Sequence, residues 1–385
     1  MKKRKICVVI TARPSYSRIK TAMSAIQAHP ALELQLVVAA SALLDRYGNA
    51  VKVIEQDGFK ISERVFMVLE GESPTSMAKT TGLGVLELAT VFDNLKPDVV
   101  ITVADRYETL ATAVAASYMN IPLCHVQGGE VSGSIDEKVR HAVTKLSDIH
   151  MVSTKRAGER VLAMGEEPGS VHCTGCPSID LAAEILSDVS LGFDPSTKYG
   201  GVGPTVDLSK GYAVVMQHPV TTEYQLARKH VTETLHAVHE LGIPTFWFWP
   251  NVDAGSDGTS TGVRAFRENV DPPNIHFFKN MEPTDFLRLI YNAKCLVGNS
   301  SVGIRESSFL GIPVVNIGSR QGGRERGANV VDVGYDRNEI KTAMERQLNQ
   351  GRYAEDHMYG DGHAGKRIAD LLAEVPLKTE KRLAY

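Results

Sequence analysis

The sequence predicts an α/β protein made of two similar halves, each built around a parallel β-sheet. Short apolar runs rich in β-branched residues alternate with longer amphipathic stretches along the whole chain. Most of these runs are apolar throughout, which is typical of parallel strands that helices cover on both faces. With 385 residues, the chain also exceeds the size of one ordinary domain.

The first half contains six predicted strands, at residues 5–10, 34–40, 98–103, 121–126, 149–152 and 171–174. Helical patterns lie between them, among others at residues 85–95, 106–119, 136–146 and 155–164. This regular alternation of strand and helix predicts one parallel sheet in this half.

The second half repeats the arrangement, with predicted strands at residues 213–216, 245–249, 275–278, 294–297 and 314–317. The periodicity fades across residues 187–211, where Gly, Pro, Ser and Thr cluster, so we place the boundary there. The expected domains are residues 1–186 and 187–362, and a last helix at 364–372, within 363–385, is expected to pack back on the first domain. In such folds ligands bind at the carboxyl ends of the strands, and a cleft between two domains is a natural site.

Composition indicates a cytoplasmic protein without affinity for nucleic acid or membrane. The net charge is −3, and 43% of the residues are apolar. The five cysteines are few, odd in number and mostly set in apolar strands, which indicates reduced thiols. The basic start of the chain precedes only a short apolar run at 6–10, which suits a first strand rather than an export signal. No window approaches the roughly 18 apolar residues of a membrane helix.

The polar residues that indicate a function follow the predicted strands directly. Arg13 and Ser17 lie where the first strand turns into a helix, a good place to bind an anion, although a plain helix cap with a solvated Arg explains them too. Asp105 and Arg106 follow the strand at 98–103, where they fit either an active site or a structural ion pair.

A Gly-Gly-Glu loop follows the strand at 121–126. Its two glycines let the backbone approach a ligand closely, and Glu130 stands in a Gly/Ser-rich segment without an evident structural role. Asp136 begins the next helix, which carries Arg140 and His141 one turn later, so Asp136 also fits a helix cap.

The second half places further polar residues at strand ends. His218 precedes a proline that favours an extended backbone, and Asn251 follows the strand at 245–249. The small-residue loop at 298–306 enters a helix, and its N–H groups with the hydroxyls of Ser300 and Ser301 can hold a phosphate pair, although a Ser-capped helix start is the alternative.

Several kinds of site are not indicated. The 298–306 loop lacks the Gly-Lys-Ser/Thr of a Walker loop, and Gly82-Leu-Gly84 follows no strand, so it is no dinucleotide fingerprint. Cys173 and Cys176 have no second pair to complete a zinc site. We therefore expect acid–base chemistry with no metal and no cofactor.

Taken together, these segments resemble the UDP-N-acetylglucosamine 2-epimerases over nearly the whole chain. The resemblance is carried by four blocks in order: His125-Val-Gln-Gly-Gly-Glu-Val-Ser-Gly133 with Asp136 and Arg140-His141, Gln217-His-Pro-Val-Thr-Thr222, Pro250-Asn-Val-Asp-Ala-Gly255, and Gly298-Asn-Ser-Ser-Val-Gly-Ile-Arg-Glu306. It implies the GT-B architecture of two facing Rossmann-like domains with an active-site cleft between them.

Two segments favour the hydrolysing branch of that family, which includes bacterial enzymes of sialic-acid synthesis. Ile317-Gly-Ser-Arg-Gln-Gly-Gly-Arg-Glu-Arg-Gly327 is similar to that branch. The segment 39–48 lacks the Gln-His-Arg with which non-hydrolysing relatives bind a second, activating sugar nucleotide. One departure bears on sugar specificity: Arg13-Pro-Ser15 lacks the acidic residue that the family usually has two positions after the Arg.

The resemblance implies a reaction and its residues. UDP-N-acetylglucosamine and water would give N-acetylmannosamine and UDP through a 2-acetamidoglycal; a relative uses UDP-N,N'-diacetylbacillosamine on the way to legionaminic acid, so that substrate is the alternative. The implied catalytic residues are Asp105, Glu130, Asp136 and His218. The implied substrate-binding residues are Arg13, Ser17, Arg106, Arg140, His141, Asn251, Asn280, Ser300, Ser301, Gly303, Glu306 and Arg320.

Three other functions compete with this one. They are a GT-B glycosyltransferase, a UDP-sugar-binding regulator that lost catalysis, and a non-hydrolysing epimerase. The carboxylate-rich Gly-Gly-Glu loop counts against the first, and the presence of Asp105, Glu130, Asp136 and His218 counts against the second. By family analogy we expect a homodimer or homotetramer.

Overall fold

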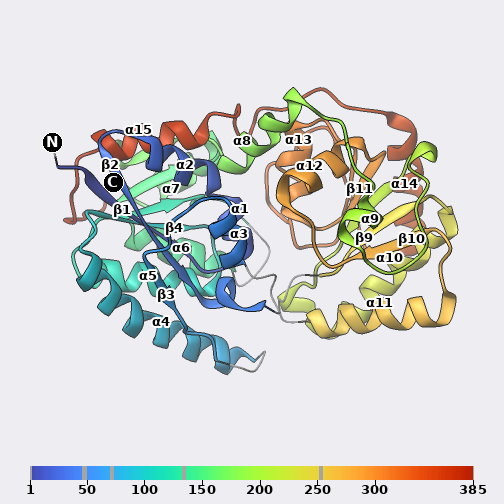
Figure 1. The fold of residues 1–385 in the computed structure, drawn as a ribbon, viewed down its shortest axis with the longest axis horizontal. Helices are drawn as coiled ribbons and strands as arrows, with labels where there is room; N and C mark the ends of the chain where they lie inside the picture. Colours follow the sequence, from blue (N-terminus) through green and yellow to red (C-terminus); the bar gives the residue numbers. More distant parts are fainter. Residues whose placement is uncertain (1, 46–49, 70–72, 132–135, 251–254, 385) are drawn as a thin grey trace. The chain divides into compact units, whose positions relative to one another are not determined.

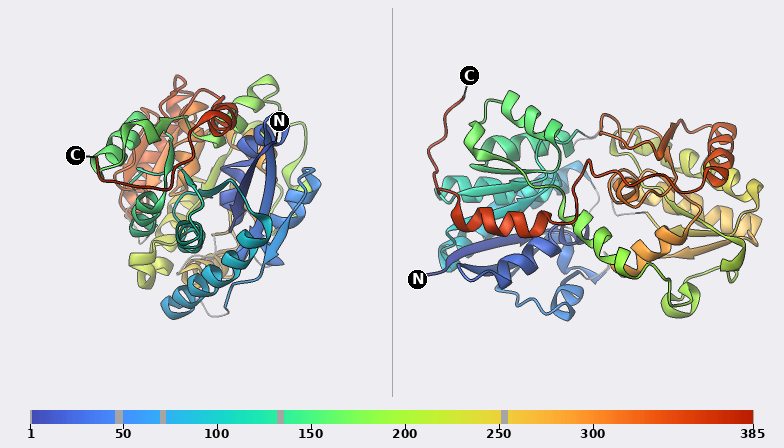
Figure 2. Two further views of the ribbon diagram at one scale, coloured as in Figure 1. Left: turned by 90° about the vertical axis from the view of Figure 1, so that its left-hand side faces the viewer. Right: turned by 90° about the horizontal axis from the view of Figure 1, so that it is seen from above.

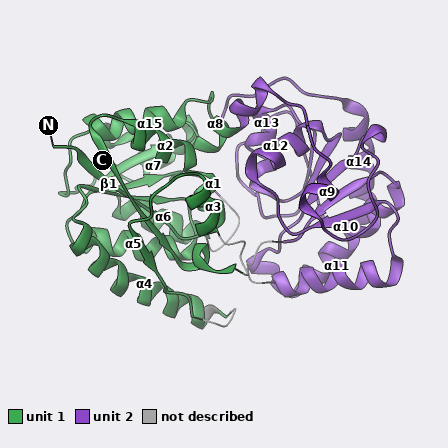
Figure 3. Ribbon diagram, in the orientation of Figure 1, with its two compact units in different colours: residues 1–130, 135–181, 359–385 green, residues 131–134, 182–358 purple. Residues whose placement is uncertain are grey.

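The chain forms two compact units in a computed structural model that describes residues 2–45, 50–69, 73–131, 136–250 and 255–384 (Figures 1 and 3). Unit 1 comprises Met1–Glu130, Ile135–Leu181 and Tyr359–Tyr385, and unit 2 comprises Val131–Ser134 and Ala182–Met358. Each unit contains one parallel sheet with helices, which confirms the predicted α/β class.

Unit 1 is built on a seven-stranded sheet in the order β3-β2-β1-β4-β5-β6-β7. Its strands are β1 Arg4–Ile10, β2 Leu32–Ala39, β3 Glu63–Val65, β4 Val99–Val103, β5 Leu123–Val126, β6 Ile149–Val152 and β7 Val171–Cys173. Its helices are α1 Arg13–Ser17, α2 Lys20–Ala28, α3 Ala50–Gln56, α4 Pro74–Leu95, α5 Tyr107–Tyr118, α6 Asp136–Leu146, α7 Lys155–Ala163 and α15 Ala364–Glu374, with α8 Pro177–Glu184 leading to unit 2.

Unit 2 is built on a six-stranded sheet in the order β10-β9-β8-β11-β12-β13. Its strands are β8 Ala213–Met216, β9 Thr245–Phe248, β10 Ile275–Phe278, β11 Cys295–Gly298, β12 Val314–Ile317 and β13 Val330–Val333. Its helices are α9 Pro195–Tyr199, α10 Ala227–Leu241, α11 Ser256–Val270, α12 Pro283–Asn292, α13 Glu306–Phe309 and α14 Arg337–Gln350.

The apolar cores follow from the pleat of the strands. Successive residues of β1 point to opposite faces, so Ile6 and Val8 pack with α2 and α15 on one face while Cys7 and Val9 pack with α4 and α5 on the other. All four side chains are buried. The continuous apolar runs of the sequence are therefore explained by helices on both faces of the sheet.

The C-terminal segment belongs to unit 1. Helix α15 packs beside α2, so that both ends of the chain lie in the same unit (Figure 2). The carboxylate of Asp180 accepts the backbone N–H groups of Ala364 and Gly365 at 2.9 and 2.6 Å and the hydroxyl of Thr21 at 2.9 Å, which joins the start of α15 to α2.

Some elements differ from those predicted. The edge strands β3 and β13 were not predicted, and helix α4 begins well before the predicted 85–95. None of the described helices is long and apolar enough to cross a membrane.

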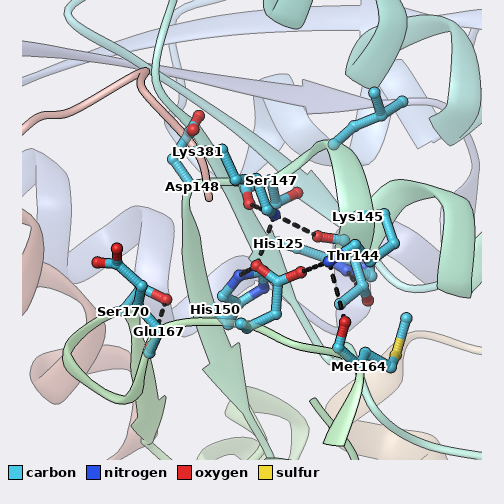
Figure 4. Close-up of polar contacts among 12 residues, drawn as sticks. His125, Thr144, Lys145, Ser147, Asp148, His150, Met164, Glu167, Ser170 and Lys381 are labelled. Carbon is cyan, nitrogen blue, oxygen red and sulfur yellow. Dashed lines mark hydrogen bonds and ion pairs between the residues drawn. The ribbon is translucent and has the colours of Figure 1, made fainter. Parts of the chain in front are cut away.

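The chain beyond α15 is held by a buried carboxylate. Glu166 contacts the Nζ atoms of Lys145 and Lys381, each at 2.6 Å, and His150 Nε2 at 2.9 Å. Figure 4 shows these two lysines and His150 gathered beside α6 and β6. Burial alone would raise the pKa of Glu166, but the hydrogen bonds from His150, Lys145 and Lys381 outweigh it and lower the pKa to about 2. Lys381 also donates to the carbonyl of Thr144 at 3.2 Å.

The Glu166→Gln variant should be less stable by about 1–3 kcal/mol at pH 7, because the partly exposed ammonium groups of Lys145 and Lys381 lose their charged hydrogen-bond partner. The folded pKa of Glu166 is depressed, so its contribution is complete above the unfolded value of 4.5 and is lost as the pH falls towards about 2. The stability gap between wild type and variant should therefore shrink between pH 4.5 and pH 2.

Urea unfolding at neutral and acidic pH measures this gap. The matched control is Glu167→Gln, which changes an exposed neighbour and should stay within about 0.5 kcal/mol of wild type. A gap that is independent of pH would contradict the assigned role of Glu166.

Candidate functional site

Four of the predicted site residues follow the strands at which the strand order of each sheet reverses. The reversal falls between β1 and β4 in unit 1 and between β8 and β11 in unit 2. On the two sides of such a point the connections leave in opposite directions, which opens a crevice at the carboxyl ends of the strands. Arg13 follows β1, Asp105 follows β4, His218 follows β8 and Ser300 follows β11. The structure thus brings together, within each unit, residues that are far apart in sequence.

A buried guanidinium holds the acids of unit 1. The Asp105 carboxylate forms an ion pair with Arg140 and lies 3.9 Å from Arg18 Nη1. Arg140 is 1% exposed, and its Nη1 donates to the backbone carbonyl of Glu130 at 2.7 Å. One side chain of α6 therefore joins the turn after β4 to the loop that carries Glu130.

Helix α6 presents a stripe of polar residues along one side. It begins at Asp136, and Arg140 and Thr144 follow at intervals of four residues, which places all three on one face. Glu130 is 4% exposed and Asp136 is half-buried. Arg140 thus joins the turn after β4, the loop after β5 and helix α6, which carry Asp105, Glu130 and Asp136 respectively.

The other predicted residues of unit 1 make local contacts. The Arg106 Nε atom lies 3.2 Å from the fully buried carboxylate of Glu108 on α5. The Ser17 hydroxyl donates to the carbonyl of Arg13 at 3.5 Å, and His141 Nε2 lies 3.2 Å from Glu137 Oε1. Glu108 was not singled out in the sequence, and its position in the first turn after Asp105-Arg106 is the signal that could have indicated it.

In unit 2, Asn299 holds the predicted histidine. Its Oδ1 accepts the backbone N–H of His218 at 2.7 Å and its Nδ2 donates to the His218 carbonyl at 2.8 Å. The backbone carbonyl of Asn299 accepts Arg320 Nη1 at 3.2 Å and Gln321 Nε2 at 2.9 Å. Asn299 was missed as an individual site residue, although it stands between Gly298 and Ser300 in the quoted loop.

The start of this loop requires a glycine. Gly298 has φ +129°, and a Cβ atom there would lie 2.1 Å from the Met216 carbonyl oxygen of the neighbouring strand. Strands β8 and β11 can therefore approach closely at their carboxyl ends, which brings the residues after them together.

A second buried guanidinium, that of Arg305, contacts the serine-containing loop after β11. Ser300 caps the short 3₁₀-helix Ser301–Gly303. Arg305 is 1% exposed; its Nη2 donates to the Ser301 hydroxyl at 2.9 Å and its Nε lies 3.9 Å from Glu306 Oε2. The loop thus combines hydroxyls with positive charge, which suits an anionic ligand. The sequence interpretation did not assign a role to Arg305.

One of the described predicted residues lies apart from these networks. Asn280 is exposed, two positions after β10, and Asn251 lies outside the described residues. In the part of the chain that the structure describes, no three His, Cys, Asp or Glu side chains are grouped so that they could hold a metal ion.

The chain is similar to known proteins over nearly its whole length. The family model described as UDP-N-acetylglucosamine 2-epimerase matches residues 24–373. The UDP-N,N'-diacetylbacillosamine 2-epimerase (hydrolyzing) of Legionella pneumophila is 32% identical over 98% of this chain and 97% of that protein. The UDP-N-acetylglucosamine 2-epimerase of Neisseria meningitidis serogroup B is 29% identical over 97% of this chain and 94% of that protein.

A solved structure shares the fold. The crystal structure of UDP-GlcNAc 2-epimerase from Neisseria meningitidis bound to UDP-GlcNAc covers 96% of this chain and 99% of its own, with a TM-score of 0.80 and 18% identity. This likeness confirms the predicted GT-B fold class.

The Asn299→Ala variant should lose roughly 2–4 kcal/mol of stability, because the backbone N–H and C=O of buried His218 lose their partners. Urea unfolding measures the loss. The control is Asn349→Ala, which removes one exposed bond to the Glu345 carbonyl and should cost no more than about 0.5 kcal/mol. Equal losses in the two variants would contradict the bridging role of Asn299.

Proposed function

Since the chain belongs to the UDP-N-acetylglucosamine 2-epimerase family, we propose that it is a hydrolysing 2-epimerase of a UDP-linked 2-acetamido sugar. UDP-N-acetylglucosamine and water would be converted to N-acetylmannosamine and UDP. The observation that carries the proposal is the frame in which one buried guanidinium, that of Arg140, contacts Asp105 and the backbone of Glu130.

The reaction needs proton transfer at C2 of the sugar. Expulsion of UDP from C1 with loss of the C2 proton gives a 2-acetamidoglycal; water then adds at C1 while a proton returns to C2 on the opposite face. Two acid–base groups on different faces are required. We assign them among Asp105, Glu130 and Asp136, which are held by β4, β5 and α6.

The reaction also needs stabilisation of the departing UDP. Negative charge develops on the diphosphate as the C1–O bond breaks, so preorganised donors there lower the barrier. We assign this role to His218, the 300–303 loop and the cationic groups Arg13 and Arg106, with Ser17 beside Arg13. Glu306 and Arg320, with Asn280, are assigned to the ribose and uracil.

A second substrate has support from the names of two relatives, one from Legionella pneumophila and one from Campylobacter jejuni. The Legionella pneumophila protein is named for UDP-N,N'-diacetylbacillosamine. The departure at Arg13-Pro-Ser15 from the family's usual acidic residue also bears on the sugar. The 2,4-diacetamido sugar nucleotide is therefore the alternative substrate for the same reaction.

Release of UDP from each of the two nucleotide sugars, followed by anion-exchange chromatography, tests both assignments. Wild type should release UDP from at least one of them without added cofactor. Asp105→Asn and Glu130→Gln should lower kcat by about 10²–10⁴-fold, because each removes an acid–base group.

Asp93→Asn is the matched control, since it makes the same chemical change on an exposed turn of α4 and should leave kcat unchanged. Near-normal turnover by Glu130→Gln would contradict the assignment of the acids. Failure of wild type to release UDP from either sugar would contradict the proposed function.

A further inference from the structure

His125 is a fully buried histidine of β5 to which the proposed reaction gives no role. Its ring is 0% exposed, with Nε2 2.8 Å from the Ala104 carbonyl oxygen and Nδ1 3.1 Å from the Thr144 hydroxyl. Figure 4 shows His125 beside Thr144 of α6. The ring therefore bridges the turn after β4 and the helix that carries Arg140.

The contacts determine which nitrogen carries the proton. A carbonyl oxygen only accepts, so Nε2 donates to Ala104, and Nδ1 must accept from the Thr144 hydroxyl. Burial lowers the pKa of His125 to about 4, so the ring is neutral at pH 7. The titratable groups that influence it are His150, Glu130 and His141. A neutral ring with one fixed tautomer acts as a rigid bridge between two elements.

The turn at Ala104, which His125 contacts, sets the direction of Asp105. Ala104 has φ +65°, a left-handed conformation that is costly for a residue with a Cβ atom. Both of its backbone groups are held by β5, since its N–H donates to the Val126 carbonyl at 2.9 Å and its carbonyl accepts from His125. Asp105 is the next residue, so its direction depends on this turn.

The Gly-Gly-Glu loop rests on the same ring. A Cβ atom on Gly128 would lie 2.9 Å from His125 Nδ1 and 3.0 Å from the Thr144 hydroxyl oxygen. The backbone of Gly128 therefore packs directly on the His125–Thr144 contact, two residues before Glu130. One imidazole thus supports two of the three candidate acids, while Thr144 lies one helical turn from Arg140, which contacts both.

We propose that His125 and Thr144 are positioning residues for the acid–base step, holding the Ala104–Asp105 turn and the Gly128–Glu130 loop in register with α6. This inference rests on the proposed function. Neither side chain exchanges a proton with the substrate; they act by fixing the acids, where a displacement of about 1 Å can cost on the order of 10²-fold in rate.

Steady-state kinetics of three histidine variants tests the inference. His125→Phe keeps an aromatic ring and removes both hydrogen bonds, so kcat should fall about 10²-fold. KM should change less than about threefold, because a displaced acid affects the reaction more than the binding of the ground state. The side-chain amide of His125→Gln can donate to the Ala104 carbonyl and accept from the Thr144 hydroxyl. Because this variant can restore both contacts, it should recover about tenfold of the kcat lost in His125→Phe.

His150→Phe is the matched control. His150 is equally buried and is the direct neighbour of His125 across β5 and β6, but its Nε2 contacts Glu166 instead. This variant should lose stability as His125→Phe does while keeping kcat. If His125→Phe does not fold, Thr144→Val removes only the hydroxyl donor and should lower kcat, and Thr144→Ser should restore it.

A spectroscopic measurement checks the geometry without relying on turnover. Proton–nitrogen NMR of histidine-labelled protein should show His125 as the neutral tautomer protonated at Nε2 from pH 6 to 8, with the signal assigned by its loss in His125→Gln. The Nδ1 tautomer, or a ring that titrates in this range, would overturn the proposal.

The kinetic outcomes separate the inference from the proposed function. Active wild type with equal kcat in His125→Phe and His150→Phe overturns the positioning role alone. Wild type that turns over neither UDP sugar overturns the proposed function and this inference with it.

Discussion

The buried guanidinium of Arg140 is the constraint on which the candidate site of unit 1 depends. The Arg140 side chain is 1% exposed, so its charged group has lost nearly all of its hydrating water. A buried charge is tolerated only where protein groups take the place of that water. Here the partners are the Asp105 carboxylate and the Glu130 carbonyl. Helix α6, the turn after β4 and the loop after β5 are thus joined, so the folded unit 1 holds the Asp105 carboxylate and the backbone of Glu130 through one side chain.

In both units, buried polar side chains bind the backbone just beyond the ends of the strands. At the carboxyl ends of neighbouring parallel strands the ladder of hydrogen bonds stops, so the residues beyond need other contacts to hold their direction. In unit 1 Arg140 and His125 provide these contacts, and in unit 2 the side chain of Asn299 binds both backbone groups of His218. In both units a candidate residue, Asp105 or His218, lies on irregular backbone that buried polar side chains contact.

Much of this fold could be predicted from sequence because its central strands are buried on both faces. Strands β6, β8, β10 and β12 have the predicted bounds, whereas the edge strand β3 was missed because Glu63 and Arg64 are exposed and give no apolar run. Polar residues directly after strands, such as Asp105 and His218, could be predicted as site candidates. The roles of His125, Asn299 and Arg305 could not, because they depend on contacts through space that no local pattern records.

In the proposed reaction a free 2-epimeric sugar is released after exchange of the C2 proton. Proton NMR of wild type in D₂O, with UDP-N-acetylglucosamine and separately with UDP-N,N'-diacetylbacillosamine, tests it most directly. We expect UDP and a free 2-epimer carrying deuterium at C2 from at least one substrate. A UDP-linked epimer, or a free sugar that keeps its C2 proton, would contradict it.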